Sequence, residues 1–359
     1  MKSIRIFDKD INLLGEIDEY EEFKLTRRFF MLSEFELKIK VKSLHADKLI
    51  KNNLLLLGKD YNKVCIILHR EFDGIENKCD MLFVKGVSLQ GLLNRRIIIP
   101  DINKSFETCS GKQETIIKHF VNKNCVNPND TKRKINRLVI ATDKLRGKED
   151  SWRSSYDNLS DKLKEIGEYC GFGWNVSLDH KEKKFIFDII EGKNLTTSQN
   201  INPPVIFRSD FNNIANRHYI ESIINSKNVV YSGTKEDSSK LVLSLGESID
   251  FERIEVFNSV DSDDVEELKK ECGLKLKEFE ELKTFELEIN PTRTFIYEKD
   301  YNLGDTVTVQ DKSLKVTMDS RIVEIEEYYT KSGLKLKITF GNNIPTIMSK
   351  INNIEKKVM

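Results

Sequence analysis

Residues 34–41 read EFELKIKV, and this stretch decides the fold class. Apolar side chains at positions 35, 37, 39 and 41 alternate with charged side chains at the positions between them. Successive side chains of a β-strand point to opposite faces, so the pattern predicts a strand with one apolar and one solvated face. Similar runs lie at residues 4–8, 63–72, 81–89 and 95–100, separated by Asp, Asn and Gly. Short strands at this spacing predict a compact, mostly antiparallel β-domain over residues 1–100.

The next hundred residues carry helical periodicity instead. Residues 112–124 place four apolar side chains on one helical face, namely Ile116, Ile117, Phe120 and Val121. Residues 158–171 repeat this pattern and end at Gly171, a residue type that often closes a helix. The stretch after it is typical of a hairpin whose turn lies near residues 179–183. These patterns predict a small α+β insertion domain over residues 101–200.

The two-residue period returns after residue 200. Strands are predicted at 205–209, 228–233, 240–246 and 253–260, and again near the C-terminus, where the last strand reads LKLKITFG. Asp263 and Glu266 form a capping pattern that predicts a helix over residues 263–282. We predict a second β-barrel-like domain over residues 201–345 with this helix inserted. A C-terminal tail, residues 346–359, is expected to be ordered only if a partner holds it. The predicted fold class is α+β and mainly β, with two antiparallel β-barrel domains and a helical α+β insertion.

The charge balance limits the classes of partner. The 359 residues include 58 Lys and Arg and 58 Asp and Glu, so the formal net charge at pH 7 is zero. Proteins held on nucleic acid or on a membrane surface usually carry a basic excess, so we expect no specific nucleic-acid site. No stretch approaches the roughly 18 apolar residues of a membrane helix, and acidic residues interrupt the N-terminus. We therefore expect a soluble protein, made in the cytosol, without a membrane anchor.

The sequence contains few features that would indicate catalysis. The six cysteines are scattered without a CxxC spacing or a histidine at zinc spacing, and the five histidines are isolated from one another. The cysteines are therefore interpreted as buried free thiols. The sequence carries no motif for an activated nucleophile or for a phosphate-binding loop. We predict that the protein is not an enzyme and has no catalytic residues, no cofactor and no metal.

Two arginine pairs, Arg27-Arg28 and Arg95-Arg96, flank predicted strands. Neighbouring strand residues face opposite sides, so one arginine of each pair can stay solvated while the other meets an acid across a subunit contact. These four arginines are candidates for a subunit interface. Ordinary surface arginines are the simpler explanation.

Longer stretches carry a family resemblance. The first is IRIFDKDINLLGEIDEYEEFKLTRRFFMLSEFELKI at 4–39, followed by LLNRRIIIP at 92–100. The last, at 297–341, contains the turn DYNLGD at Asp300–Asp305 and ends in Phe340-Gly341. These stretches, with residues 205–233 and the helix beginning at Asp263 between them, resemble in order a family of phage tail hub proteins, also called baseplate hub or tail-associated proteins. The resemblance is weakest over residues 101–200.

The resemblance implies a structural hub. Members form homotrimers with two tail-tube-like β-barrels per subunit, and the resulting pseudo-sixfold ring joins a hexameric tail tube to a trimeric spike. The expected partners are further copies of the chain, the tail tube protein and a spike or tail-tip protein, with other baseplate proteins and the tape measure as further candidates. The expected location is the tail or baseplate of a virion, or of a phage-tail-like bacteriocin, assembled in the host bacterial cytoplasm. The chain ends soon after Gly341, which favours a short hub of the contractile injection kind without a lytic extension.

Two alternatives stay open. One is a cell-wall hydrolase that acts through the insertion at residues 101–200. The other is a carbohydrate-binding tail component that stacks Trp152 or Trp174 on a sugar, although we expect Trp174, which follows a helix-ending glycine and opens a hairpin, to cover a small core.

Overall fold

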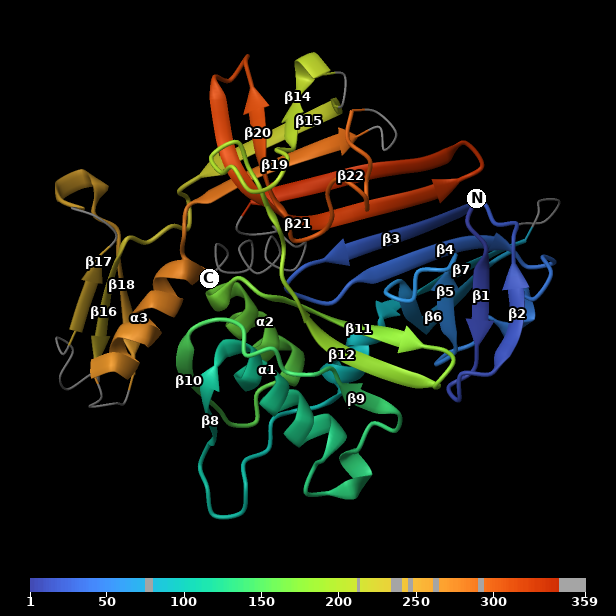
Figure 1. Ribbon diagram of the computed structural model, residues 1–359, viewed down its shortest axis with the longest axis horizontal. Helices are drawn as coiled ribbons and strands as arrows, with labels where there is room; N and C mark the ends of the chain where they lie inside the picture. The colour runs from blue at the N-terminus through green and yellow to red at the C-terminus, as the bar shows by residue number, and fades with distance from the viewer. Residues whose placement is uncertain are drawn as a thin grey trace. The chain divides into compact units, whose positions relative to one another are not determined.

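The computed structural model describes residues 1–74, 80–211, 214–233, 241–244, 248–260, 265–289 and 294–341 (Figure 1). This part of the chain is mainly β with few helices, so the predicted α+β, mainly β fold class is confirmed. The chain divides into two compact units, Met1–Asn216 with Leu287–Thr339 (unit 1) and Arg217–Glu286 with Phe340–Met359 (unit 2). Cys79 and the predicted tail at 346–359 lie outside the described residues.

Seven strands of unit 1 pair in the order β3-β4-β7-β6-β5-β1-β2, and every neighbouring pair is antiparallel. They are β1 (Ile4–Phe7), β2 (Leu13–Ile17), β3 (Glu22–Arg28), β4 (Glu34–Lys40), β5 (Leu54–Leu57), β6 (Val64–Asp73) and β7 (Met81–Ser88), with the 3₁₀ helix η1 (Ala46–Lys48) between β4 and β5. In β4 the odd-numbered residues are buried and the even-numbered residues are exposed, as the sequence pattern predicts.

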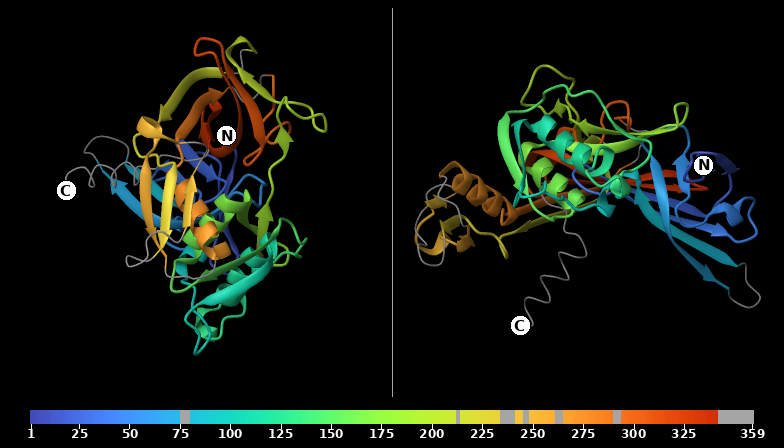
Figure 2. Two further views of the ribbon diagram at one scale, coloured as in Figure 1. Left: turned by 90° about the vertical axis from the view of Figure 1, so that its left-hand side faces the viewer. Right: turned by 90° about the horizontal axis from the view of Figure 1, so that it is seen from below.

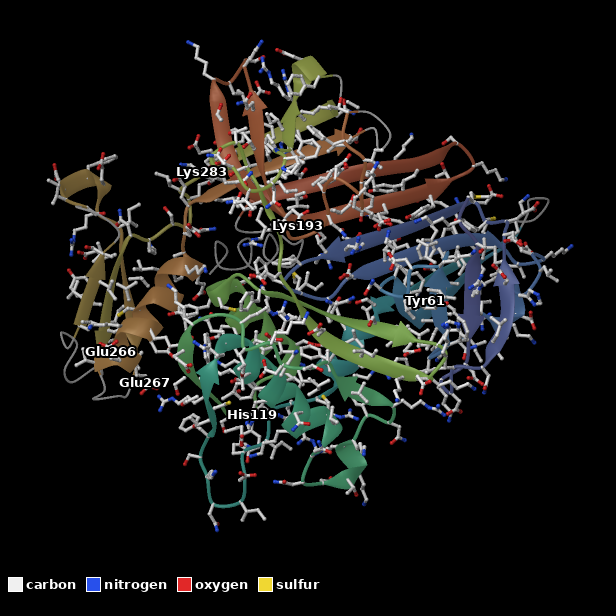
Figure 3. The ribbon with its side chains drawn as sticks, viewed as in Figure 1. Tyr61, His119, Lys193, Glu266, Glu267 and Lys283 are labelled. Atoms are coloured by element: carbon white, nitrogen blue, oxygen red, sulfur yellow. The ribbon has the colours of Figure 1, made fainter. Side chains whose placement is uncertain are left out.

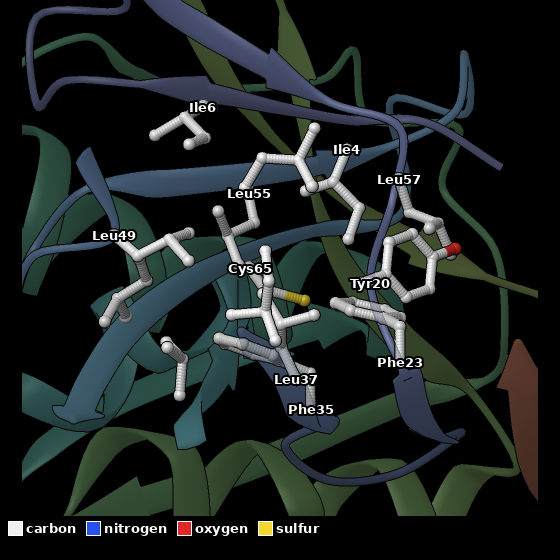
Figure 4. Packing of buried hydrophobic residues seen from close by; sticks show 14 of the residues in the cluster. Ile4, Ile6, Tyr20, Phe23, Phe35, Leu37, Leu49, Leu55, Leu57 and Cys65 are labelled. Carbon is white, nitrogen blue, oxygen red and sulfur yellow. The ribbon is translucent and has the colours of Figure 1, made fainter. Parts of the chain in front are cut away.

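One hydrophobic cluster takes side chains from all seven strands (Figure 4). Phe23 of β3 stacks on Phe35 of β4, with ring centroids 5.7 Å apart. Ile17 belongs to the same cluster although β2 is the last strand of the order, at the opposite end from β3. Side chains from both ends of a sheet meet in one core only if the sheet curls around that core. Tube-like closure of this region stays a prediction.

The strand predicted at residues 95–100 is wrong. The 3₁₀ helix η2 (Leu89–Arg95) occupies the start of this segment, and Arg96 closes it by donating its backbone N–H to the Leu93 carbonyl at 3.1 Å. Ile97 then forms only an isolated bridge with Asn158. Pro100 follows directly and has no backbone N–H with which to extend a ladder.

The insertion of unit 1 holds two helices in contact, α1 (Gln113–Val121) and α2 (Leu159–Cys170) (Figures 1 and 2). Asn158 caps α2 with a side-chain oxygen that accepts the Ser160 N–H at 2.9 Å, and Gly171 ends it with a φ of 79°. The predicted hairpin is present as β11 and β12. The remaining elements are β8 (Glu107–Lys112), β9 (Leu138–Ile140), β10 (Glu149–Ser154), β11 (Gly173–Asp179), β12 (Lys184–Ile190), the π-helix η3 (Asn122–Val126) and the 3₁₀ helix η4 (Thr131–Arg133).

The C-terminal strands of unit 1 extend the N-terminal sheet. They are β20 (Thr306–Asp311), β21 (Val316–Thr330) and β22 (Gly333–Gly341), with β13 (Asn194–Leu195) and β14 (Ile206–Arg208) parallel to β20. The first part of β21 pairs with β20, and its last part pairs with β3. Gly304 opens this region with a φ of 92°, and a Cβ there would lie 2.2 Å from the Phe29 ring, so the turn requires glycine.

Unit 2 contains a small sheet and a helix. The sheet has the order β17-β16-β18, and α3 packs on it through Cys272 and Leu276, which contact Val230. The elements lying wholly in unit 2 are β16 (Val229–Gly233), β17 (Leu241–Ser244), β18 (Glu255–Ser259), α3 (Val265–Glu278) and the 3₁₀ helix η6 (Asp250–Glu252). The strands β15 (Ile214–Ser222) and β19 (Leu282–Ile289) each have three residues in unit 1, and the 3₁₀ helix η5 (Ser209–Phe211) lies in unit 1. The helix predicted over residues 263–282 is present as α3, but it ends at Glu278 and Leu282 already begins β19, while residues 263–264 lie outside the described residues. The three-part domain division, with a second barrel at 201–345, stays a prediction.

Gly86 of β7 offers a test of the sheet packing. A Cβ at this position would lie 1.9 Å from the Ile66 carbonyl oxygen in β6. We expect Gly86→Ala to lower the free energy of unfolding by about 1–3 kcal/mol in urea denaturation, because a paired backbone carbonyl has little room to move. Gly273→Ala in α3, where nothing lies within 4 Å of an added methyl group, is the control and should not destabilise. Equal stability of the Gly86→Ala protein and the wild type would contradict the described packing of β6 on β7.

Candidate functional site

Two cations and two carboxylates meet inside unit 1. With two tyrosines they form the buried ionic cluster, which consists of Arg27, Lys63, Tyr297, Glu298, Glu327 and Tyr329. Glu298 lies at its solvent-facing edge, with a side chain that is 32% exposed. The side chains of Lys63 and Glu327 are fully buried, with Lys63 Nζ 2.8 Å from Glu327 Oε2. Lys63 Nζ also lies 2.5 Å from Glu298 Oε1. Arg27 Nη1 lies 3.6 Å from Glu327 Oε1 and 3.5 Å from Glu298 Oε1. The four formal charges balance, as burial of ions requires.

Two tyrosine hydroxyls complete the surroundings of Glu327. Tyr297 donates to Oε1 at 2.6 Å and Tyr329 donates to Oε2 at 2.5 Å. Burial raises the pKa of both hydroxyls, and the Glu327 carboxylate raises the pKa of Tyr329 further, so both stay protonated. With the bond from Lys63, the carboxylate accepts three hydrogen bonds, which offset the loss of its water shell.

The cluster joins segments that are distant along the chain. Arg27 lies in β3, Lys63 directly precedes β6 and Glu327 lies in β21, 264 residues after Lys63. Tyr297 belongs to the segment that leads into the Asp300–Asp305 turn. The turn that carries the family resemblance is therefore fixed to the sheet by ionic contacts, and the chemistry of the cluster is structural.

The buried ionic cluster was not predicted from the sequence. One signal was available in β21, where Val323, Ile325 and Tyr329 are buried at alternate positions. Glu327 occupies the same row and is equally buried. An acid in an apolar row requires a partner, but the sequence alone does not indicate which cation supplies it.

Arg27 and Arg28, two of the interface candidates, lie side by side in β3 and pair with acids of their own chain. Arg27 takes part in the buried ionic cluster. Arg28 Nε lies 2.7 Å from Glu324 Oε2, and its Nη1 lies 2.9 Å from Glu34 Oε1. The two guanidinium groups contact different acids, as expected for neighbours in a strand. A contact of either arginine with another subunit stays a prediction.

Arg95 and Arg96, the other two candidates, line a different feature, which we call the basic pocket. It has a volume of about 400 Å³ and is lined by Asn94, Arg95, Arg96, Ile97, Lys132, Arg133 and Asn158. Four of these seven residues are cations, and the lining contains no acid. Arg95 and Arg96 were candidates from the sequence, but Lys132 and Arg133 were not, because η4 brings these two to the pocket from a separate segment.

Both tryptophans are buried, which was expected for Trp174 only. Trp174 has no exposed surface and donates its Nε1–H to the Phe30 carbonyl at 3.0 Å. Trp152 is 3% exposed and donates its Nε1–H to Asp150 Oδ2 at 2.8 Å. Neither indole offers a free face on which a sugar could stack.

The hydrolase alternative depends on reactive groups in the insertion, where His119 lies on α1 (Figure 3). His119 Nε2 lies 2.7 Å from Glu107 Oε1, and Lys123 Nζ lies 2.5 Å from Glu107 Oε2. Burial raises the pKa of the nearby Cys109 thiol, which keeps it protonated and weakly nucleophilic at neutral pH. The Glu107 carboxylate therefore contacts both His119 and Lys123. None of these three side chains, nor Cys109, is an activated nucleophile.

The five described cysteines, Cys65, Cys109, Cys125, Cys170 and Cys272, are free thiols. Across the described ranges, no group of three or more His, Cys, Asp or Glu side chains is arranged as a metal site. In the same ranges, no helix combines the length and the apolar character that crossing a membrane requires.

Comparison with known proteins identifies relatives of the whole chain. The family model described as Siphovirus ReqiPepy6 Gp37-like protein matches residues 3–342. No curated protein matches the sequence. The tail protein from Neisseria meningitidis MC58 is 13% identical, with a TM-score of 0.60 over 95% of this chain and 96% of that chain.

Two prophage proteins share the same fold. The 43 kDa tail protein of prophage MuSo2 from Shewanella oneidensis is 11% identical, with a TM-score of 0.58 over 95% of this chain and 96% of that chain. The prophage tail protein gp18 from Listeria monocytogenes EGD-e is 12% identical, with a TM-score of 0.57 over 99% of both chains. At these identities the likeness establishes the fold alone.

Removal of one buried charge tests the ionic cluster. We expect Lys63→Met to lower the free energy of unfolding by about 3–5 kcal/mol in urea denaturation, because Glu327 then loses its closest cation without regaining water. Lys85→Met is the matched control, since Lys85 forms a surface pair with Glu36 at 3.4 Å and should cost less than about 1 kcal/mol. Similar losses in the two variants would contradict the cluster.

Acid sensitivity tests the same carboxylate. Burial raises the pKa of Glu327, but the charges of Lys63 and Arg27 and the hydrogen bonds from Lys63 and Tyr297 together lower it more, so its pKa lies below the ordinary value. In the unfolded chain the carboxyl takes up a proton near pH 4.3, so the stability that Glu327 contributes is full above about pH 5 and falls as the pH drops through the lower folded pKa. We expect Glu327→Gln to lower stability at pH 7 and to flatten the loss of stability in acid. The exposed Glu19→Gln variant should keep the wild-type acid profile, and an unchanged profile in Glu327→Gln would count against the assignment.

Proposed function

The chain belongs to the Siphovirus ReqiPepy6 Gp37-like protein family, so its resemblance to phage tail proteins is confirmed, and we propose that it is a structural hub of a phage tail or baseplate. In this proposal three copies form a ring that receives the tail tube on one side and a spike or tail-tip protein on the other. The protein acts through assembly and catalyses no reaction. Its location is the tail of the virion.

The extent of the family match carries this proposal. Residues 3–342 match one family model, and solved tail proteins share the fold over 95% or more of this chain. Because the match spans nearly the whole chain, the similarity to tail proteins includes the insertion and is not limited to one barrel-like part. The hub role itself rests on the DYNLGD turn and the order of the β-regions, which resemble tail hub proteins.

The strand order of unit 1 supports assembly through sheet edges. β2 is the last strand of its sheet and pairs only with β1 among the described residues. Leu13 of β2 is 59% exposed. An edge strand with free backbone groups is an aggregation hazard unless something covers it, and pairing with the next subunit of a closed ring is one way to cover it.

The buried ionic cluster supports a rigid adaptor. It holds β3 and β21, which pair from Arg28 with Glu324 to Glu22 with Thr330, in one fixed register. A hub has to keep its N-terminal and C-terminal strands in a constant relation for its ring to match both neighbours. The sugar-binding alternative is not supported by its two indoles, because both are buried. The hydrolase alternative was based on the insertion at residues 101–200, where the raised pKa of Cys109 does not favour a nucleophilic thiol.

Sedimentation tests the trimer. Analytical ultracentrifugation of the purified chain, alone or co-expressed with its spike, should reveal a ring species with three copies of the 41.7 kDa chain, about 125 kDa in chain mass. Monomers alone under both conditions would argue against the hub.

A pair of matched variants tests the role of β2. We expect Leu13→Lys to raise the dissociation constant of the trimer at least about tenfold, because a lysine on an edge strand opposes strand pairing. Leu44→Lys places the same side chain at a 74% exposed position outside the strands and should leave assembly unchanged. Equal assembly of the two variants would remove β2 from the interface.

A further inference from the structure

We propose that the basic pocket is a binding site for a phosphate group. This inference does not depend on the proposed hub role, because it rests on charges and hydrogen bonds within unit 1. The four cations of the pocket are Arg95, Arg96, Lys132 and Arg133.

The positive charge of the pocket is not neutralised within the chain. In the described part of the structure, none of the four cations forms an ion pair with an acid. One acid, Asp130, acts electrostatically on Arg133, and its side chain accepts the backbone N–H of Lys132 at 2.9 Å. Burial and the adjacent charge of Arg96 both lower the pKa of Arg133. Cys125 and Asp130 raise it, and the effect of Asp130 is the smallest of the four. A bound anion would relieve this repulsion between like charges.

Two of the guanidinium groups are held in place by backbone oxygens. Arg96 donates from Nε to the Arg133 carbonyl at 2.7 Å and from Nη1 to the Arg95 carbonyl at 3.0 Å. Arg133 donates from Nη2 to the Ile97 carbonyl. Arg96 Nη2 has no hydrogen-bond partner among the described residues and stays available to a ligand. Groups fixed in this way lose little entropy when an anion binds.

The first turn of α2 adds positive potential to the same pocket. Asn158, the N-cap of α2, is part of the lining. The backbone N–H groups of this turn are already used, since Asn158 Oδ1 accepts from Ser160 and the Arg96 carbonyl accepts from Leu159. The helix therefore contributes through its dipole and not through direct hydrogen bonds.

The number of cations favours phosphate over a carboxylate. A carboxylate brings one negative charge and two oxygens, which leaves most of the four positive charges unbalanced. A phosphate monoester carries a charge of about −1.5 to −2 near pH 7 and three acceptor oxygens, and arginine side chains bind such groups through paired N–H donors. The pocket, at about 400 Å³, has room for the phosphate and part of the molecule that carries it.

Calorimetric titration of the full chain with inorganic phosphate, in a phosphate-free buffer of low ionic strength, tests this site. We expect saturable binding to one site that weakens as sodium chloride is added. Arg96→Gln with Arg133→Gln should weaken binding at least about tenfold, as loss of hydrogen bonds to a charged group predicts. Arg70→Gln removes an exposed arginine of β6 and should change the affinity by less than about twofold.

A second variant keeps the test decisive if the first does not fold. Arg95→Gln with Lys132→Gln removes two charges without touching the bonds that hold Arg96 and Arg133, and we expect a loss of affinity of about threefold or more. Titration with methyl phosphate and with dimethyl phosphate distinguishes a terminal phosphate from a phosphodiester within a polymer. The proposal is overturned if phosphate shows no saturable binding, if Arg95→Gln with Lys132→Gln binds as tightly as the wild type, or if acetate binds as tightly as phosphate.

Discussion

The fold of unit 1 depends on a balance of buried charge. Lys63 and Glu327 have no contact with water, and each is stable there only because the other is present with Arg27, Glu298 and two tyrosine donors. Loss of Lys63 or of Glu327 leaves the other without its closest counter-ion in a place that water does not reach. The C-terminal strand β21 and the segment before the Asp300–Asp305 turn must therefore dock on β3 in one arrangement.

Local patterns were sufficient to predict most elements of the fold. Alternation in β4, the apolar face of α1 and the closing glycine of α2 are each properties of a short stretch, and the structure contains all three. The strand predicted at residues 95–100 failed because the apolar residues there are held by hydrogen bonds to the loop before α2 and not by a neighbouring strand. Pairing partners of this kind are not visible in the periodicity of one segment.

The candidate sites were less predictable because they form between distant segments. Glu327 could be recognised as an acid in an apolar row, but Lys63 lies 264 residues away and has an unremarkable sequence context. Arg95 and Arg96 are recognisable as a pair in the sequence, but the basic pocket also includes Lys132 and Arg133 of η4, which is a separate segment. The assignment to a tail protein came from the order of several motifs, since residue chemistry pointed to no reaction.

The long strand β21 also determines how this region would respond to a pulling force. Its 15 residues extend over roughly 50 Å, and one uninterrupted backbone pairs first with β20 and then with β3. A tensile force applied along it would act as shear on its ladders with β20 and β3 at once, a geometry in which many bonds resist together instead of parting one by one. Because the backbone of β21 is continuous, it would transmit that force from β20 to β3 without passing through a flexible loop.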